Sequence, residues 1–283
     1  MRFEEEDLHG GMGAYIGVKK VLFEGGDIQK IYLFDSFEHG RVLAIDKSIQ
    51  LTEREEGTYH EAITHVPLFT HGNAKRVLII GGGDGGTAAR VLMHKTVVHV
   101  KLIEIDGTVV EVSKEYLASV HKNAFNDVRL DLEIGDGARF VNETDERFDV
   151  VIVDCSDPDP VDSANNVLFS SEFYADARRV LLPGGIFVMQ NGIPNLQREE
   201  LVNSMQNLKN LFSYATCYLV DAPMYVGGNL ALSFATDDAF LVDIPLATLR
   251  ERFEVAGIDT EYYTPELHKA MFALPKSVMK IVE

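Results

Sequence analysis

The sequence predicts an α/β protein in which a small N-terminal antiparallel β domain precedes a Rossmann-like, doubly wound and mostly parallel sheet. Up to about residue 55, short runs rich in β-branched and aromatic residues are separated by glycines, as in antiparallel hairpins. Beyond that point, apolar strands alternate with helical segments, and the first of these strands leads into a run of glycines. Because no linker rich in glycine, serine or proline separates the two parts, we expect a β domain over 1–55 to pack closely on a Rossmann-like domain over 56–283.

The first part contains segments that predict strands over residues 13–22, 30–34 and 41–45. Gly25, Gly26 and Asp27 lie between the first two segments and predict a hairpin turn, because these residue types suit the backbone angles of such turns. Strands joined by connections this short are antiparallel.

The second part begins with a predicted helix over 59–69, which we expect to end near Pro67. Asp106 is a favourable N-cap for a helix that runs to about residue 117. A further helix is predicted over 171–181 and is expected to end at Pro183-Gly184-Gly185. The other predicted helices cover 87–94 and 199–212.

The strands of the second part follow from continuous or alternating apolar runs, and the run at 149–153 is apolar throughout, as in a buried parallel strand. The predicted strands cover 77–80, 98–105, 128–134, 149–153, 186–190, 215–220 and 230–235. No helix is predicted between the last two, so we expect them to form an antiparallel edge of the sheet.

Charge and composition exclude several function classes. With 26 basic and 44 acidic side chains the net charge is -18, which disfavours binding to nucleic acid or to anionic membranes. The two cysteines cannot form a disulfide framework and do not have zinc-site spacing. No apolar stretch has the length of a membrane span, and the acidic N-terminus does not resemble a secretory signal. We therefore expect a reduced, cytoplasmic setting.

The glycine run at residues 81–86 reads Gly-Gly-Gly-Asp-Gly-Gly and follows a predicted strand. It satisfies G-x-G-x-x-G, for which a dinucleotide site is the usual interpretation. Asp84 argues against that site, because its carboxylate would repel a pyrophosphate, whereas it would attract an ammonium group. The alternative for Asp84 is a helix N-cap.

Acidic residues also follow the next two strands. Glu104 lies about twenty positions beyond the glycine run, where an acidic side chain typically binds ribose hydroxyls. Asp106, close by, is better explained as a helix cap. Asp136, between two glycines, is expected either to accept a hydrogen bond from an adenine amino group or to form an ordinary turn. Together these loops predict a nucleoside site.

Asp154 and Asp157 follow the buried strand at 149–153 and predict a cation site, with a solvated acidic loop as the alternative. With Asp84 they form an acidic end of the pocket that suits a nucleoside carrying an ammonium but no carboxylate. S-adenosylmethionine carries both groups. Methyltransferases usually have an acidic residue just before the first glycine, where this chain has Ile79 and Ile80.

These motifs resemble those of the polyamine aminopropyltransferases, the spermidine synthase family. The resemblance covers nearly the whole chain, and the motifs are jointly specific. The matching segments are 40–43, 50–56, 59–61, 77–86, 104–106, 135–137, 154–158, 262–266 with His268, and 272–275.

The resemblance implies transfer of the aminopropyl group of decarboxylated S-adenosylmethionine to a primary amine, most often putrescine, with release of methylthioadenosine. The donor is a co-substrate, and no metal or redox cofactor is expected. Asp154 matches the proton acceptor, with Tyr59 assisting it. Family members are dimers or tetramers. The other implied site residues are Gln29, Asp84, Glu104, Asp136 and Gly137 for the donor, and His60, Asp157, Gln190 and Tyr225 for the acceptor.

The sequence departs from the family pattern near the expected acceptor end. The loop at 159–167 is longer than usual and adds Asp159 and Asp162, while Gly57 and Val226 replace bulkier residues. These changes favour a longer or more highly charged acceptor such as spermidine or agmatine, with cadaverine a further candidate. An S-adenosylmethionine-dependent methyltransferase and a non-catalytic homologue remain alternatives.

Overall fold

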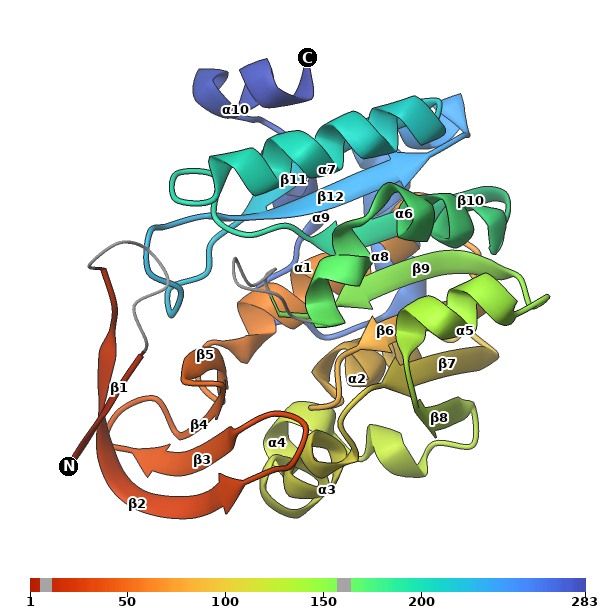
Figure 1. Cartoon of the computed structure of the whole chain (residues 1–283). Coiled ribbons are helices and arrows are strands. Elements are labelled where there is room, and N and C mark those ends of the chain that lie inside the picture. The colour runs from red at the N-terminus through yellow and green to blue at the C-terminus, as the bar shows by residue number, and fades with distance from the viewer. Residues whose placement is uncertain (6–11, 157–163) are drawn as a thin grey trace.

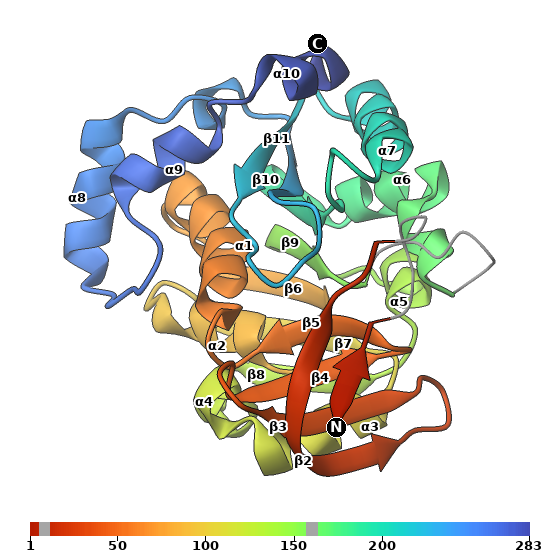
Figure 2. The ribbon, with the colours of Figure 1, turned by 90° about the vertical axis from the view of Figure 1, so that its left-hand side faces the viewer.

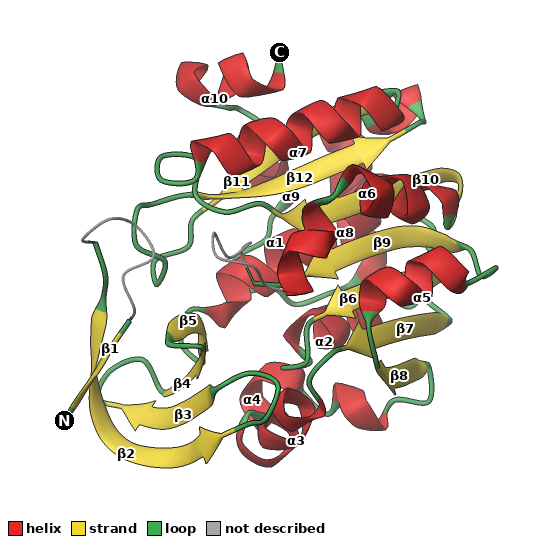
Figure 3. Ribbon diagram, in the orientation of Figure 1, coloured by secondary structure: helices red, strands yellow, loops and turns green. Residues whose placement is uncertain are grey.

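The computed structural model describes residues 1–5, 12–156 and 164–283, except for the side chains of 164–166. The described residues form two sheets, and Figures 1 and 3 show an N-terminal part made of strands beside a larger part in which helices surround a sheet. The predicted α/β class, with an antiparallel sheet ahead of a mostly parallel one, is confirmed.

Within the described residues, the N-terminal sheet has five strands in chain order, each antiparallel to the next. The strands are β1 (Arg2–Glu4), β2 (Tyr15–Gly25), β3 (Ile31–Ser36), β4 (Arg41–Ile45) and β5 (Ser48–Thr52). The predicted hairpin turn lies between β2 and β3, where Gly25 pairs with Ile31. The sequence does not predict β1, because its length is too short to show an alternating pattern.

The larger sheet, over the described part of the chain, has seven strands in the order β11-β12-β10-β9-β6-β7-β8. They are β6 (Arg76–Gly81), β7 (His99–Glu104), β8 (Leu130–Ile134), β9 (Phe148–Asp154), β10 (Leu181–Gln190), β11 (Tyr214–Val220) and β12 (Leu230–Thr236). Neighbours from β10 through β8 are parallel, whereas β12 is antiparallel to both β10 and β11. The predicted antiparallel edge is therefore confirmed.

Helices cover both faces of the larger sheet, which explains why its central strands are continuously apolar. The helices are α1 (Glu56–His71), α2 (Gly86–Met93), α3 (Gly107–Tyr116), α4 (Ala118–His121), α5 (Gly137–Glu143), α6 (Ser171–Arg179), α7 (Arg198–Leu211), α8 (Leu246–Ala256), α9 (Pro265–Met271) and α10 (Lys276–Val282). In β6, Val77 and Ile79 belong to the apolar cluster that also includes residues of α1, α2 and α8, while Leu78 and Ile80 belong to the cluster that includes residues of α5, α6 and α7. Figure 2 shows these two helical layers on opposite sides of the sheet.

The two sheets are joined through α3. Ile31 and Leu33 of β3 form one buried apolar cluster with Val109 and Val112 of α3. Because α3 follows β7 directly, this packing fixes the N-terminal sheet beside the carboxyl ends of the parallel strands.

The helix α1 extends beyond its prediction at both ends, and Pro67 lies inside it. A proline in a helix removes one backbone hydrogen bond, here the one that residue 67 would donate to Ile63. Residues 60–70 of α1 are all buried, so packing stabilises the turn at 63–67 that lacks this hydrogen bond. The helix ends at Gly72, which is left-handed with φ 78°.

The segment Pro183-Gly184-Gly185 does not end a helix, as the sequence predicts, but lies inside β10. The helix α6 already ends at Arg179, and Leu181 pairs with Phe148 of β9 before the proline is reached. The register between the two strands shifts between Leu181 and Ile186, so the segment is an irregularity in a strand.

Sequence patterns also fail to predict α4, α5 and the three described helices after β12. Most of these are short, and a short helix depends on tertiary packing more than on its own propensity. No helix in the described residues combines the length and apolar character that a bilayer span requires.

Candidate active site

A cavity of about 560 Å³ lies at the carboxyl ends of β6, β7 and β9, with the N-terminal sheet forming part of its wall. Ligand sites of open α/β sheets occupy this edge. Every predicted site residue that the structure describes lines this cavity: Gln29, Tyr59, His60, Asp84, Glu104, Asp136, Gly137, Asp154, Gln190 and Tyr225. Asp157, which is also predicted, lies outside the described residues.

Asp154 is the last residue of β9, and hydroxyl groups hold both of its carboxylate oxygens. The Tyr59 hydroxyl donates to Oδ1 at 2.6 Å, and the Thr87 hydroxyl donates to Oδ2 at 2.6 Å. Burial raises the pKa of Tyr59 well above its usual value, and the neighbouring Asp154 adds to this. Tyr59 therefore stays protonated and acts as a donor that orients Asp154.

Thr87 is a site residue that sequence reasoning misses. It is fully buried in the first turn of α2, directly after the glycine run. Its position in that turn is the signal available in the sequence, since helix N-termini after glycine loops commonly contribute to ligand sites.

Asp84, His60 and Asp154 form a cluster at one end of the cavity. One ligand-type atom from each lies within 4.8 Å of the other two. The Asp84 carboxylate accepts a hydrogen bond from the Gly86 amide at 2.7 Å, so it satisfies the first amide of α2 although the N-cap residue itself is Gly85. In the described part of the chain, Asp84, His60 and Asp154 are close enough together to surround a small cation.

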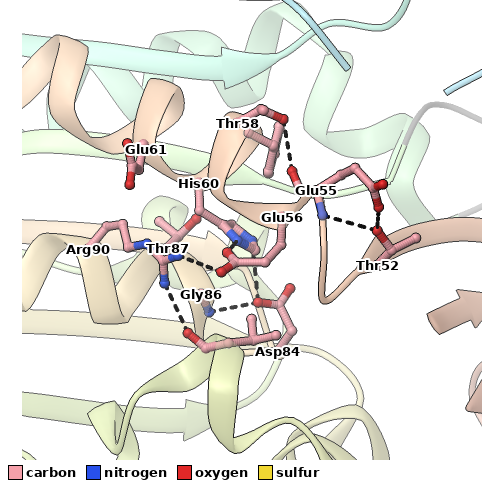
Figure 4. A network of polar contacts seen from close by, with 12 residues as sticks. Thr52, Glu55, Glu56, Thr58, His60, Glu61, Asp84, Gly86, Thr87 and Arg90 are labelled. Carbon is pink, nitrogen blue, oxygen red and sulfur yellow. Dashed lines mark hydrogen bonds and ion pairs between the residues drawn. The ribbon is translucent and has the colours of Figure 1, made fainter. Parts of the chain in front are cut away.

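The His60 ring lies against the glycine run, and Figure 4 shows it between Glu56 and Asp84. Its Nδ1 is 2.6 Å from Glu56 Oε2, and its Nε2 is 3.4 Å from Asp84 Oδ1. A Cβ at Gly86 would lie 2.3 Å from the ring, so only glycine fits there. Burial alone would lower the pKa of His60, but Asp84, Glu56 and Asp154 outweigh it and raise that pKa.

Glu104 ends β7 at the other side of the glycine run. Its Oε2 accepts a hydrogen bond from the Gly83 amide at 3.0 Å, and its Oε1 accepts one from the Asp106 amide at 2.9 Å. Burial raises the pKa of Glu104 to about 7. A Cβ at Gly83 would lie 2.7 Å from Oε2, so glycine is required for this close approach.

Asp106 links the two sheets beside the part of the cavity where the sequence predicts a nucleoside. Its Oδ1 accepts a hydrogen bond from the Thr108 amide, which confirms the predicted cap of α3. Its Oδ2 accepts one from the Gln29 amide at 3.3 Å, which brings the turn of the N-terminal sheet to the cavity wall.

Asp136 is exposed and caps α5 through hydrogen bonds from the amides of Ala138 and Arg139. The turn that the sequence leaves as an alternative is thus present, and the residue also lines the cavity. Gly137 is buried, and a Cβ there would lie 2.3 Å from Ile80.

Gln190 and Tyr225 contribute to the wall on the side of β10 and β12. The Gln190 amide group accepts from the Gly192 amide at 2.6 Å and donates to the Cys155 carbonyl at 3.2 Å. The Tyr225 hydroxyl donates to the Gln50 carbonyl at 2.6 Å, which ties the loop before β12 to β5. The two hydrogen bonds of Gln190 hold its side-chain amide in one orientation.

The departures from the family pattern near the expected acceptor end fall into two groups, those that the structure describes and those that it does not. Val226 lines the cavity, but Gly57 does not, and a Cβ at Gly57 would meet only Glu261 Oε2 at 3.7 Å. The expectation that Gly57 enlarges the acceptor end is therefore wrong, because its side-chain direction on α1 is away from the cavity. Asp159 and Asp162 lie outside the described residues.

The arrangement combines a nucleoside-sized cavity with a carboxylate poised between two hydroxyl groups and a cation-attracting cluster. Such a site suits the displacement of a leaving group by a positively charged substrate that must lose a proton.

Two family models match the chain. Residues 56–244 match the spermine/spermidine synthase domain, and residues 1–53 match the spermidine synthase tetramerisation domain. The chain is also 47% identical over 277 residues to a polyamine aminopropyltransferase from Ruegeria sp. (strain TM1040), covering 98% of this chain and 96% of that protein. A polyamine aminopropyltransferase from Erwinia tasmaniensis is 44% identical over 276 residues, covering 97% of this chain and 95% of that protein.

Solved structures give the same result. A spermidine synthase in complex with the transition state analogue AdoDATO superimposes with a TM-score of 0.92 at 32% identity, covering 100% of this chain and 94% of that one. The spermidine synthase from Thermotoga maritima superimposes with a TM-score of 0.89 at 31% identity, with the same coverage of 100% and 94%. The chain belongs to the spermine/spermidine synthase family and is an aminopropyltransferase.

Proposed function

We propose that the cavity binds decarboxylated S-adenosylmethionine and a primary amine, preferentially putrescine, and that the enzyme forms spermidine and methylthioadenosine. The observation that carries this proposal is Asp154, whose carboxylate is held by two hydroxyl groups beside Asp84 and His60. Gln29, Glu104, Asp136 and Gly137 are proposed to bind the methylthioadenosine part, with Asp84 binding the donor ammonium. His60, Asp157, Gln190 and Tyr225 are proposed to bind the acceptor.

In the proposed reaction, the acceptor nitrogen attacks the aminopropyl carbon that is bonded to the sulfonium. The carbon–nitrogen bond forms, the carbon–sulfur bond breaks, and methylthioadenosine leaves with the electron pair. The proton lost by the nitrogen passes to Asp154 and then to solvent. An ordinary aspartate is a weak base for an amine, so orientation and charge complementarity supply most of the acceleration.

Asp84 is proposed to select the decarboxylated donor over S-adenosylmethionine. The carboxylate of S-adenosylmethionine would be repelled by Asp84 and Asp154, which lie together in the cation cluster. Calorimetry should give tighter binding of the decarboxylated compound, and Asp84→Asn should narrow the difference. Equal affinity of the wild-type protein for both compounds would favour a methyltransferase and contradict this selection.

Putrescine is proposed as the first acceptor, ahead of spermidine, agmatine and cadaverine. Gly57 no longer supports a longer acceptor, since it does not line the cavity. Relative rates for the four amines, measured with decarboxylated S-adenosylmethionine and read by product mass, test this order. A higher rate with spermidine or agmatine would reassign the acceptor.

We further propose that catalysis needs no metal ion or redox cofactor and that the enzyme acts in the cytoplasm as a homodimer or homotetramer. The match of residues 1–53 to a tetramerisation domain supports a homo-oligomer. The net charge of -18 supports the absence of nucleic-acid or membrane partners. Dialysis against EDTA should leave the rate unchanged, and light scattering should give the mass of two or four chains.

A further inference from the structure

Glu56 and Arg90 form a buried chain of charges behind His60, although neither residue lines the cavity. Figure 4 shows a row of side-chain contacts that runs from Arg90 on α2, through Glu56 and His60 at the start of α1, to Asp84 in the glycine run. The side chains of Glu56 and Arg90 are 8% and 2% exposed. Burying a charge costs desolvation free energy, and a buried charge that has no partner destabilises the fold strongly. The partners of Glu56 and Arg90 therefore indicate the role of each residue.

His60 and Arg90 together keep Glu56 in its ionised form. The Arg90 guanidinium donates to the Val120 carbonyl at 3.0 Å and to Glu56 Oε1 at 2.5 Å. Burial alone would raise the pKa of Glu56, but His60 and Arg90 outweigh it and lower that pKa. Glu56 is therefore a carboxylate at neutral pH.

The ionised Glu56 determines how the His60 ring carries its protons. A carboxylate only accepts hydrogen bonds, so the 2.6 Å contact between Glu56 Oε2 and His60 Nδ1 requires a proton on Nδ1. The remaining nitrogen, Nε2, lies 3.4 Å from Asp84 Oδ1 at the cavity. His60 thus has two states, with Nε2 either protonated and paired to Asp84 or unprotonated and able to accept a hydrogen bond.

The charges around His60 favour the protonated state while the cavity contains no cation. Glu56 on its own helix, Asp84 on the glycine run and Asp154 on β9 all face the ring, and the Tyr59 ring packs beside it. A cation that binds at Asp84 reverses this balance, because it takes over the carboxylate and repels the charge on Nε2.

We propose that Glu56 and Arg90 are positioning residues that keep a proton on His60 Nε2 in the free enzyme, and that this proton leaves when a substrate ammonium binds at Asp84. The Nε2–H bond breaks, the proton passes to the buffer, and the ammonium replaces it beside Asp84. The inference rests on the proposed function, because the ammonium is that of the decarboxylated donor.

The exchange has a defined pH dependence. Below the pKa of His60 in the free enzyme, the proton competes with the ammonium, so donor affinity rises with pH. Exchange of one proton gives a change of about tenfold in Kd per pH unit on the acidic side. The raised pKa of His60 extends this competition toward neutral pH.

The test counts protons by calorimetry on the intact oligomer at pH 7, in phosphate and in Tris, which differ in ionisation enthalpy. Decarboxylated S-adenosylmethionine should release a substantial fraction of one proton per site. Methylthioadenosine, which has the same nucleoside but no ammonium, should release none. Binding of the donor with the same proton count as methylthioadenosine would overturn the inference and leave the proposed function standing, whereas absence of donor binding would overturn both.

Two glutamate variants sharpen the test. Glu56→Gln keeps an acceptor for Nδ1 but removes the charge, so proton release should fall by more than half and the pH dependence of donor Kd should flatten. Glu55→Gln is the matched control, because Glu55 Oε1 contacts a different histidine, His39, at 3.1 Å. Unchanged proton release in Glu56→Gln would remove Glu56 from the exchange. If that variant does not fold, the comparison of the two ligands on the wild-type protein still decides.

Discussion

His60 and His65 lie on the same helix and are both buried, yet their surroundings give them opposite charge preferences. His60 faces Glu56 and Asp84, which raise its pKa. His65 Nδ1 instead lies 2.9 Å from His94 Nε2. Burial lowers the pKa of His65 well below its usual value and that of His94 to about 3. Partners, and not burial, therefore decide which of these histidines carries charge.

His65 and His94 belong to a cluster of neutral buried histidines, the neutral cluster, which continues to the C-terminal helices. His268 of α9 contacts the Tyr263 hydroxyl at 2.9 Å and the Thr70 hydroxyl at 3.3 Å, and burial lowers its pKa to about 3. The rings of Phe69 and Tyr263 stack between the two parts of the cluster. One end of α1 thus contributes to the charged cluster at the cavity and the other to the hydrophobic core.

The largest effect is expected from Asp154→Asn, which removes the charge at the centre of the charged cluster. Loss of a proton acceptor should lower kcat by about 10² to 10⁴, while the melting temperature and methylthioadenosine binding change little. Steady-state kinetics and thermal melting measure both. Asp145→Asn, on the exposed approach to the other end of β9, is the control and should retain wild-type kcat. Near-normal turnover of Asp154→Asn would remove Asp154 from the mechanism.

Gly86→Ala should displace the His60 ring without adding or removing a charge. The new Cβ would lie 2.3 to 2.6 Å from three ring atoms, so the ring must move away from Asp84. Misplacement of this size should lower kcat/KM about 10- to 100-fold. A kcat/KM equal to that of the wild type would show that the ring position does not matter for the reaction.

Acid should lower the free energy of unfolding, because the buried histidines of the neutral cluster take up a proton more readily in the unfolded chain than in the folded one. The folded pKa of His94 is about 3 and the unfolded value is 6.5, so its stabilising contribution is complete above pH 6.5 and is lost as pH falls. At pH 5 the loss is about 2 kcal/mol for this one group.

Urea unfolding of the wild type and of His94→Gln at pH 7.5 and pH 5 measures this loss. The variant should lose about 2 kcal/mol less than the wild type over that interval. Glu104, whose pKa is raised to about 7, acts in the opposite direction, but its contribution is common to both proteins and cancels. Equal losses in the two proteins would contradict a neutral His94.

The smallest effect is expected from Gly57→Ala, on the helix that carries both clusters but outside each of them. Alanine loses less backbone entropy on folding and meets only Glu261 at 3.7 Å, so stability should rise by about 0.4 to 1 kcal/mol. The relative rates for putrescine and spermidine should be unchanged. A shift in that ratio would mean that Gly57 shapes the acceptor end after all.

Features with a local signature were predictable from the sequence. The glycine run after an apolar strand and the Asp106 cap are readable because their chemistry lies within a few residues. Acidic residues that end parallel strands meet at one sheet edge, so Asp84, Glu104 and Asp154 reach the same cavity.

The features that sequence reasoning misses depend on contacts between distant segments. The pairing of Arg90 with Glu56 arises where α1 packs on α2, and the sequence offers only the four-residue spacing of Glu56 and His60 as a sign of it. Pro67 does not end α1, because packing of the buried helix outweighs the lost hydrogen bond. The direction in which a Cβ at position 57 would point likewise depends on how α1 packs against its neighbours.

The most direct test of the account is a product analysis with decarboxylated S-adenosylmethionine and putrescine. The account predicts spermidine and methylthioadenosine in equal molar amounts, identified by mass, with no turnover when S-adenosylmethionine replaces the donor. Transfer of a methyl group from S-adenosylmethionine, or no aminopropylated product with any amine of the panel, would contradict it.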